Sequence, residues 1–124
     1  MNFLKLFEDW EDRETFEARS VIFSEDEPAD VMYVILSGKV EMSLHGEVLG
    51  TEGVGGIIGE MAIVNAAARN SCATAQTDVV LARLDKGHIR EMVDLSSEFS
   101  LHAMATLANR LRAVDRYISA HIEK

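Results

Sequence analysis

Between Val21 and Leu84 the sequence breaks into short β-rich runs that are separated by signals for tight turns. The clearest runs are Val21–Phe23, Val31–Leu36, Lys39–Leu44, Glu47–Leu49, Ser71–Gln76 and Val79–Leu84. Ser37-Gly38 and His45-Gly46 stand between neighbouring runs and are typical of hairpin turns. Many short strands joined in this way indicate an antiparallel roll.

Helical patterns flank these strands at both ends. Asn2–Phe16 places aromatic and aliphatic residues among acids, which indicates one or two short amphipathic helices. Lys86–Val93 predicts a short helix, and Ser96 or Ser97 is expected to cap a long one. We therefore expect an α+β fold, with an antiparallel β-roll of the jelly-roll or double-stranded β-helix type, N-terminal helices and a long C-terminal helix.

The length of 124 residues is enough for one domain and not for two. We divide it into an N-terminal helical segment (1–17), a roll (18–85) and a hinge with C-terminal helices (86–122). The longest apolar runs are too short to cross a bilayer, and no pattern of a cleaved leader opens the chain. With Cys72 as its one cysteine, the chain is expected to be cytoplasmic.

The charge balance argues against a nucleic-acid surface. Twelve basic residues stand against twenty-one acidic ones, for a net charge of −9. Affinity for nucleic acid depends on cations that neutralise phosphates, so this chain alone is not expected to bind DNA. The acidic run Glu8–Glu17 is either solvated surface or a contact for a basic protein partner.

The segment Gly56–Ala73 carries the strongest chemical signal. Gly59-Glu60 opens a short helical turn, and Arg69 follows the glutamate by nine residues. Unpaired backbone N–H groups at a helix start favour an anion, and an arginine can complete a phosphate site with a two-pronged hydrogen bond. Gly59 allows close approach of the backbone, and Glu60 can accept hydrogen bonds from sugar hydroxyls.

This segment resembles the phosphate-binding cassette of cyclic nucleotide-binding domains. The match consists of Gly59-Glu60-Met61-Ala62-Ile63 followed by Arg69-Asn70-Ser71. The resemblance extends over residues 16–118 and includes the run Tyr33-Val34-Ile35-Leu36-Ser37-Gly38. It implies a regulatory module that binds cAMP, with cGMP left open, and that moves its C-terminal helices toward a protein partner.

Family resemblance implies that Glu60 bonds the ribose 2′-hydroxyl, Arg69 the cyclic phosphate, and the Met61 and Ala62 backbone further ligand atoms. Ala68 stands where the family often has proline, and Asn70 where it has a small residue. Asp115 aligns with a residue that contacts the base and is either a base acceptor or a solvated helix residue. The expected site residues are Ile58, Gly59, Glu60, Met61, Ala62, Arg69, Asn70, Ser71 and Asp115.

The C-terminal helix carries an apolar stripe whose members are spaced by three and four residues. They are Met104, Leu107, Leu111, Val114 and Ile118. The stripe is either the face that packs on the roll or the seam of a homodimer, and we favour the seam because activator-type relatives dimerise through this helix.

Other functions have weaker support. We find no nucleophile–base set, so an enzyme is not expected. A cupin-type metalloenzyme needs a His-x-His pair, whereas His45, His88, His102 and His121 are scattered. A structural domain whose pocket stays empty is an alternative, although such relatives have lost the glutamate and arginine. No helix-turn-helix follows the last helix, so the chain is either a fragment of a transcription regulator or a stand-alone module.

Overall fold

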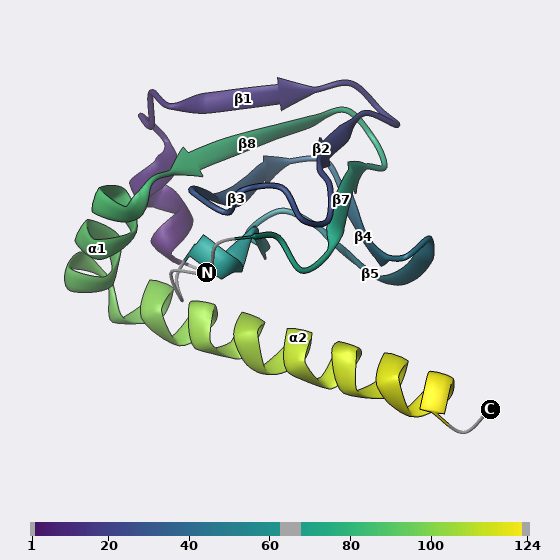
Figure 1. Cartoon of the computed structure of the whole chain (residues 1–124). Coiled ribbons are helices and arrows are strands. Elements are labelled where there is room, and N and C mark those ends of the chain that lie inside the picture. The colour runs from purple at the N-terminus through teal and green to yellow at the C-terminus, as the bar shows by residue number, and fades with distance from the viewer. Residues whose placement is uncertain (1, 63–67, 123–124) are drawn as a thin grey trace.

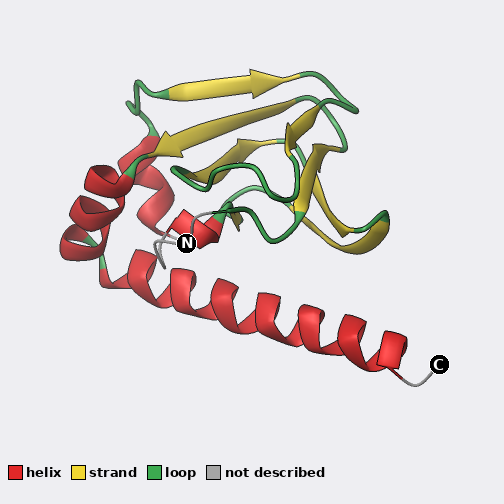
Figure 2. Ribbon diagram, viewed as in Figure 1, coloured by secondary structure: helices red, strands yellow, loops and turns green. Residues whose placement is uncertain are grey.

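A computed structural model describes residues 2–62 and 68–122. Two four-stranded antiparallel sheets face each other as a roll, and the helices lie along one side of it (Figures 1 and 2). The sheets have the strand orders β1-β8-β3-β6 and β2-β7-β4-β5. The strands are β1 (Arg13–Phe16), β2 (Val21–Phe23), β3 (Met32–Ser37), β4 (Val40–Leu44), β5 (Glu47–Glu52), β6 (Ile57–Ile58), β7 (Cys72–Ala75) and β8 (Val79–Leu84).

The strand β3 divides the core into two parts. Its side chains alternate between the two faces of the sheet. Tyr33 and Ile35 pack inside the roll, while Met32 and Val34 pack against the helices. Both faces are therefore buried, which explains why the apolar run is continuous rather than alternating.

The helices are η1 (Asn2–Phe7) and η2 (Glu60–Ala62), both of the 3₁₀ type, and the α-helices α1 (Lys86–Leu95) and α2 (Ser97–Ile122). Ser96 caps α2, because its Oγ accepts a hydrogen bond of 3.1 Å from the Phe99 amide. Phe99, Ala103 and Thr106 recur at helical spacing and form the buried face of α2. Within the described ranges, no helix combines the length and the apolarity that a membrane crossing requires.

The predicted α+β roll with its long final helix is confirmed, and the N-terminal segment 1–17 needs a correction. Helix η1 ends at Phe7, and Arg13–Phe16 is a strand that pairs with β8 from Arg13↔Ala82 to Phe16↔Val79. The physical reason is that β8 offers an open edge to pair with. The side chain of Arg13 also ends η1, because its Nη2 donates to the carbonyls of Phe7 and Glu8.

Two further boundaries differ from the expectation. Strand β5 runs to Glu52, beyond the predicted Glu47–Leu49, and the glycine-rich stretch after it leads into the short strand β6. Pairing explains both, because β5 pairs along β4 as far as Val40↔Glu52, and β6 pairs with Tyr33 and Val34 of β3. Strand β6 is followed directly by Gly59, a buried residue that leads into η2.

Candidate functional site

Gly59 connects β6 to η2 in a conformation that favours glycine. Its φ is +73°, and a Cβ built there would lie 2.7 Å from Nη1 of Arg69 and 3.2 Å from the carbonyl oxygen of Val31. The Arg69 guanidinium therefore lies directly against the glycine backbone, and its Nη1 donates to the Gly59 carbonyl at 3.1 Å.

Arg69 is a buried cation with unused hydrogen-bonding capacity. Its side chain is 5 % exposed, and its Nε has no hydrogen-bond partner among the described residues. Burial lowers the pKa of the Arg69 guanidinium below its usual value. An arginine nevertheless stays protonated in a protein, so the group keeps its positive charge and one N–H without an acceptor among the described residues.

The main chain of Arg69 is held by the loop between β2 and β3. Its amide donates to the Glu27 carbonyl at 2.7 Å, and its carbonyl accepts from the Asp26 amide at 3.0 Å. An isolated bridge joins Pro28 to Ala68, one residue earlier. The position of Arg69 is thus fixed from the neighbouring loop. Residues 63–67 of the predicted cassette 56–73 lie outside the described residues.

Glu60 is the second buried charge and belongs to η2. Its side chain is 3 % exposed, and its Oε1 has no hydrogen-bond partner in the described ranges. A buried carboxylate oxygen without a donor is unfavourable by about 1–3 kcal/mol or more. Such an atom can accept a hydrogen bond from a hydroxyl group of a bound molecule.

Arg110 of α2 reaches Glu60 from the helical layer, a residue that sequence reasoning missed. Its Nε lies 3.2 Å from Glu60 Oε2, its Nη1 donates to Glu52 Oε1 at 2.8 Å, and its Nη2 donates to the Ile57 carbonyl at 2.9 Å. A signal existed in the sequence, because Arg110 continues the buried helical face of Phe99, Ala103 and Thr106.

A hollow of about 160 Å³ adjoins Arg110 between the β4–β5 hairpin and α2. Apolar groups of the hairpin and of α2 line it, and polar groups of α2 line it beside Arg110. The lining residues are Met42, Leu49, Gly50, Thr51, Glu52, Asn109, Arg110, Ala113 and Arg116. A flat ring could pack there beside Glu52 and Arg110.

The other expected site residues occupy different environments. Ile58 and Ala62 are buried, Met61 is half-buried, and Ser71 is 6 % exposed at the start of β7. The Ala62 amide donates to the Gly59 carbonyl at 3.2 Å, so a ligand would share this donor with the turn. Asn70 is exposed.

Asp115 is not brought to the cassette within one chain. It is exposed on α2, five residues beyond Arg110, and so points away from the face that Arg110 occupies.

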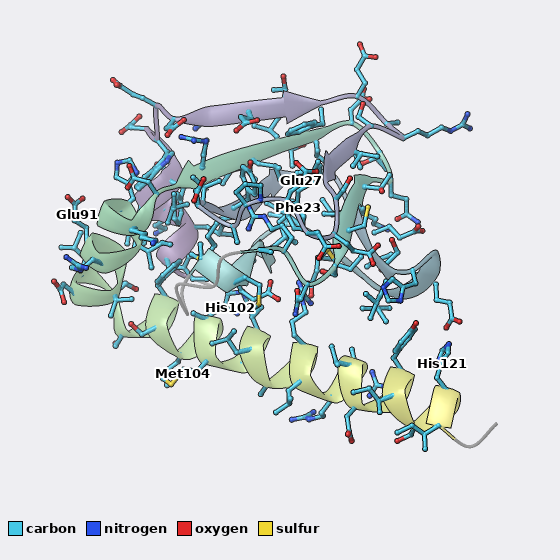
Figure 3. The ribbon with its side chains drawn as sticks, in the orientation of Figure 1. Phe23, Glu27, Glu91, His102, Met104 and His121 are labelled. Atoms are coloured by element: carbon cyan, nitrogen blue, oxygen red, sulfur yellow. The ribbon has the colours of Figure 1, made fainter. Side chains whose placement is uncertain are left out.

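The residues of the predicted seam divide into exposed and half-buried ones. Met104, Leu111 and Ile118 are exposed, and Figure 3 shows Met104 pointing away from the roll, whereas Leu107 and Val114 are half-buried.

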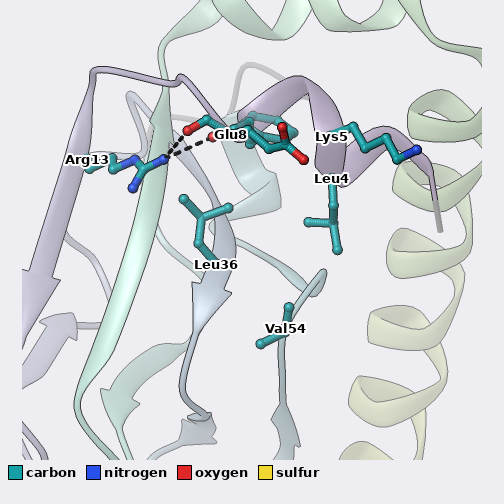
Figure 4. Close-up of a pocket in the computed structure, with 7 residues that line it drawn as sticks. Leu4, Lys5, Glu8, Arg13, Leu36 and Val54 are labelled. Carbon is teal, nitrogen blue, oxygen red and sulfur yellow. Dashed lines mark hydrogen bonds between the residues drawn. The ribbon is translucent and has the colours of Figure 1, made fainter.

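A second hollow lies away from the cassette, between η1, the end of β3 and the loop that holds Val54 (Figure 4). Leu4, Leu36 and Val54 give it apolar walls. Lys5 and Arg13 also line it, and Arg13 donates to the carbonyls of Phe7 and Glu8 and, through Nε, to that of Trp10. Because these bonds close the end of η1, we assign Arg13 a structural role.

Comparison with known proteins identifies the family of this domain. The family model of the cyclic nucleotide-binding domain matches residues 13–96. A CRP-like cAMP-activated global transcriptional regulator of Mycobacterium tuberculosis is 30% identical over 103 residues, which are 79% of this chain and 46% of the regulator. The cGMP-dependent protein kinase egl-4 of Caenorhabditis elegans is 35% identical over 65 residues, which are 52% of this chain and 8% of the kinase.

A solved structure supports the fold. The c-di-GMP responsive global regulator CLP of Xanthomonas campestris matches with a TM-score of 0.76 and 24% identity, over 94% of this chain and 61% of that protein. At this identity the likeness shows the fold alone. The chain spans 46% of the length of the M. tuberculosis regulator.

Proposed function

The chain belongs to the family of cyclic nucleotide-binding domains, and we propose that it captures a 3′,5′-cyclic nucleotide between Arg69 and Glu60. The observation that carries this proposal is a pair of opposite buried charges on either side of Gly59, each with an atom that lacks a hydrogen-bond partner within residues 2–62 and 68–122. A cyclic nucleotide supplies the complement of both, because its phosphate is an anion and its ribose 2′-hydroxyl is a donor.

Each part of the ligand has a place in the proposed complex. The phosphate would accept from the free edge of Arg69, in a charge-assisted hydrogen bond. The 2′-hydroxyl would donate to Glu60 Oε1, and the base would enter the hollow between the β4–β5 hairpin and α2. Asn70 and Ser71 follow Arg69 and would border the phosphate.

We take the ligand to be cAMP and keep cGMP as the alternative. The M. tuberculosis relative is named as cAMP-activated and matches more of this chain, whereas the worm kinase is named as cGMP-dependent. Both purine bases fit the same phosphate and ribose contacts, so the choice depends on groups near the base. Comparing the two nucleotides in one titration series decides between them.

Signalling is proposed to pass through α2. The ion pair between Arg110 and Glu60 connects this helix to the residue that would meet the ribose. A ligand that donates to Glu60 changes the balance of this contact and can shift α2 by as much as its affinities for the two arrangements differ. The output would reach a protein partner, which the acidic surface Glu8–Glu17 could contact.

We further propose a homodimer through the exposed face of α2. Seven residues separate Met104 from Leu111 and Leu111 from Ile118, and Leu101 and Ile122 extend the stripe at both ends. Five large apolar side chains exposed along one helix are typical of a two-helix seam. Asp115 lies on the same stripe and would meet a base only across this seam.

The alternative is a ligand-free structural domain of the same fold. Isothermal titration calorimetry of the whole chain with cAMP and with cGMP distinguishes the two functions. We expect one site per chain, a loss of about 2–5 kcal/mol in Arg69→Ala, and a smaller loss in Arg69→Lys, which keeps the charge without the fork.

The matched control is Arg90→Ala, which removes an exposed arginine of α1 and should bind as the wild type does. Circular dichroism of each variant verifies that the fold is retained. If the wild type and both Arg69 variants give the same heats, the binding site is not at Arg69. If no nucleotide produces heat with the wild type, the structural alternative holds.

A further inference from the structure

The Arg69 guanidinium stacks on an aromatic pair inside the roll. Its central carbon lies 4.3 Å from the centroid of the Phe23 ring. The Phe23 ring packs in turn against Tyr33, with ring centroids 6.5 Å apart and ring planes inclined by 12°. Phe23 is 5 % exposed and Tyr33 is 7 % exposed, so the three groups form a buried stack.

The stack supplies what a desolvated cation needs. Among the described residues, no carboxylate lies within ion-pair distance of Arg69, and its Nη1 donates to the neutral Gly59 carbonyl. The face of an aromatic ring attracts a cation, and this attraction reaches about 2 kcal/mol when both groups are removed from water. The ring thus stabilises the charge without neutralising it.

The stack also determines which atoms remain free. A guanidinium donates its hydrogen bonds in its own plane, so a ring against its face leaves the edges available. On one edge Nη1 donates to the Gly59 carbonyl, and Nε has no hydrogen-bond partner in the described part of the chain. A carboxylate in place of the ring would occupy these donors and compete with an anionic ligand.

The stack and the contacts that hold the main chain of Arg69 come from the same part of the fold. Phe23 ends β2 and Tyr33 belongs to β3, and the loop between these strands supplies the amide of Asp26 and the carbonyl of Glu27. Tyr33 is tied in turn to Glu14 of β1, whose Oε1 lies 3.4 Å from the tyrosine oxygen. The loop between β2 and β3 therefore holds the main chain of Arg69, and the strands on either side of this loop supply the rings beside its guanidinium.

We propose that Phe23 is a positioning residue for ligand binding, which holds the charged Arg69 fork in the plane where it meets a phosphate. This inference rests on the proposed binding of a cyclic nucleotide at Arg69. Phe23 itself does not touch the ligand. Its effect on affinity is transmitted through the orientation and the charge of Arg69, with Tyr33 packed against the Phe23 ring.

Three variants of the whole chain test this role. Phe23→Leu removes the ring and keeps an apolar side chain, Phe23→Tyr keeps the ring, and Phe16→Leu removes a ring that packs against the same core cluster away from Arg69. In calorimetry with cAMP, Phe23→Leu should bind roughly 5- to 30-fold more weakly than the wild type. Phe23→Tyr should restore most of the affinity, and Phe16→Leu should stay within about twofold.

A ligand-free readout separates positioning from a general loss of stability. The ring current of Phe23 should shift the Nε–H proton of Arg69 upfield in a ¹⁵N-arginine spectrum. We expect the shift to vanish in Phe23→Leu and to persist in Phe23→Tyr and Phe16→Leu. An unshifted signal in the wild type overturns the stack.

The affinities distinguish failure of this inference from failure of the proposed function. Arg69-dependent binding in the wild type together with unchanged affinity in Phe23→Leu overturns the role of Phe23 alone. An equal loss in Phe16→Leu assigns the effect to core packing and also overturns it. A wild type that binds no cyclic nucleotide overturns the proposed function, and the role of Phe23 with it.

Discussion

Arg110 of α2 lies with its Nε 3.2 Å from Oε2 of Glu60, so the long helix is joined to the cassette by a buried ion pair. The geometry gives charge compensation without a hydrogen bond from Nε, since this atom has no hydrogen-bond partner in the described residues. The other two nitrogens of Arg110 bond to Glu52 and to the Ile57 carbonyl. The helix is therefore attached to β5, β6 and η2 through one side chain.

Removing this side chain should destabilise the ligand-free protein. In Arg110→Ala the carboxylate of Glu60 stays buried without its counter-ion, and we expect the free energy of unfolding to fall by about 3 kcal/mol. The control is Arg112→Ala, which removes an exposed arginine from the same helix and should change stability by less than about 0.5 kcal/mol. Urea denaturation followed by circular dichroism measures both, and equal midpoints would show that the ion pair does not stabilise the fold.

The role of Glu60 toward ribose can be isolated with a modified nucleotide. A hydrogen bond to a charged acceptor contributes about 1.5–3 kcal/mol, so 2′-deoxy-cAMP should bind the wild type at least tenfold more weakly than cAMP. Against Glu60→Ala the two nucleotides should bind almost equally. Glu60→Gln should lie between, because an amide oxygen accepts without the charge. If deletion of the 2′-hydroxyl weakens binding equally in all three proteins, the hydroxyl does not meet Glu60.

The parts of the fold that could be predicted depend on contacts between neighbours in sequence. His45-Gly46 joins β4 to β5, which pair as the hairpin signal predicts, and Ser96 caps the helix that begins beside it. The hairpin expected at Ser37-Gly38 is wrong, because this turn joins β3 to β4, which belong to different sheets. Gly59, Glu60 and Arg69 could be found because their chemistry is compact along the chain. Strand β1 could not, because its pairing with β8 comes from a distant segment, and aromatic residues among acids suit a helix equally well.

The parts of the site that the sequence did not reveal are contacts between distant elements. Arg110 contacts the cassette only because its side of α2 packs on the roll, and the stripe from Met104 to Ile118 directed attention to the other side. Phe23 and Tyr33 are ordinary core residues by pattern, and their stack with Arg69 depends on the register of β2 and β3. Such roles become visible when side-chain directions are known.

Gly59→Ala should abolish binding through the position of Arg69. The added methyl group would lie 2.7 Å from Nη1 of Arg69 and would push the guanidinium out of its place. The matched control is Gly46→Ala in the β4–β5 turn, where φ is +81° and nothing lies within 4 Å of the new Cβ. Both variants carry backbone strain of about 1–2 kcal/mol, and they differ in the contact with Arg69. Calorimetry with cAMP should show a loss in Gly59→Ala alone, and equal affinities would exclude a binding role for the Gly59–Arg69 contact.

The exposed stripe of α2 should mediate self-association, and Leu111 lies at its centre with 72 % of its surface exposed. Leu111→Glu would bury a charge in an apolar seam and should convert a dimer into monomers. Ala120→Glu adds the same charge at an exposed position nine residues beyond Leu111, on the opposite side of α2, and should leave the dimer intact. Light scattering and sedimentation of the three proteins measure the mass directly. Because Asp115 lies on the stripe between Leu111 and Ile118, two such carboxylates would approach each other in a parallel dimer, and Asp115→Asn should tighten association at neutral pH in the absence of nucleotide. A monomeric wild type at micromolar concentration, or dissociation by Ala120→Glu as complete as by Leu111→Glu, would exclude this face as the seam.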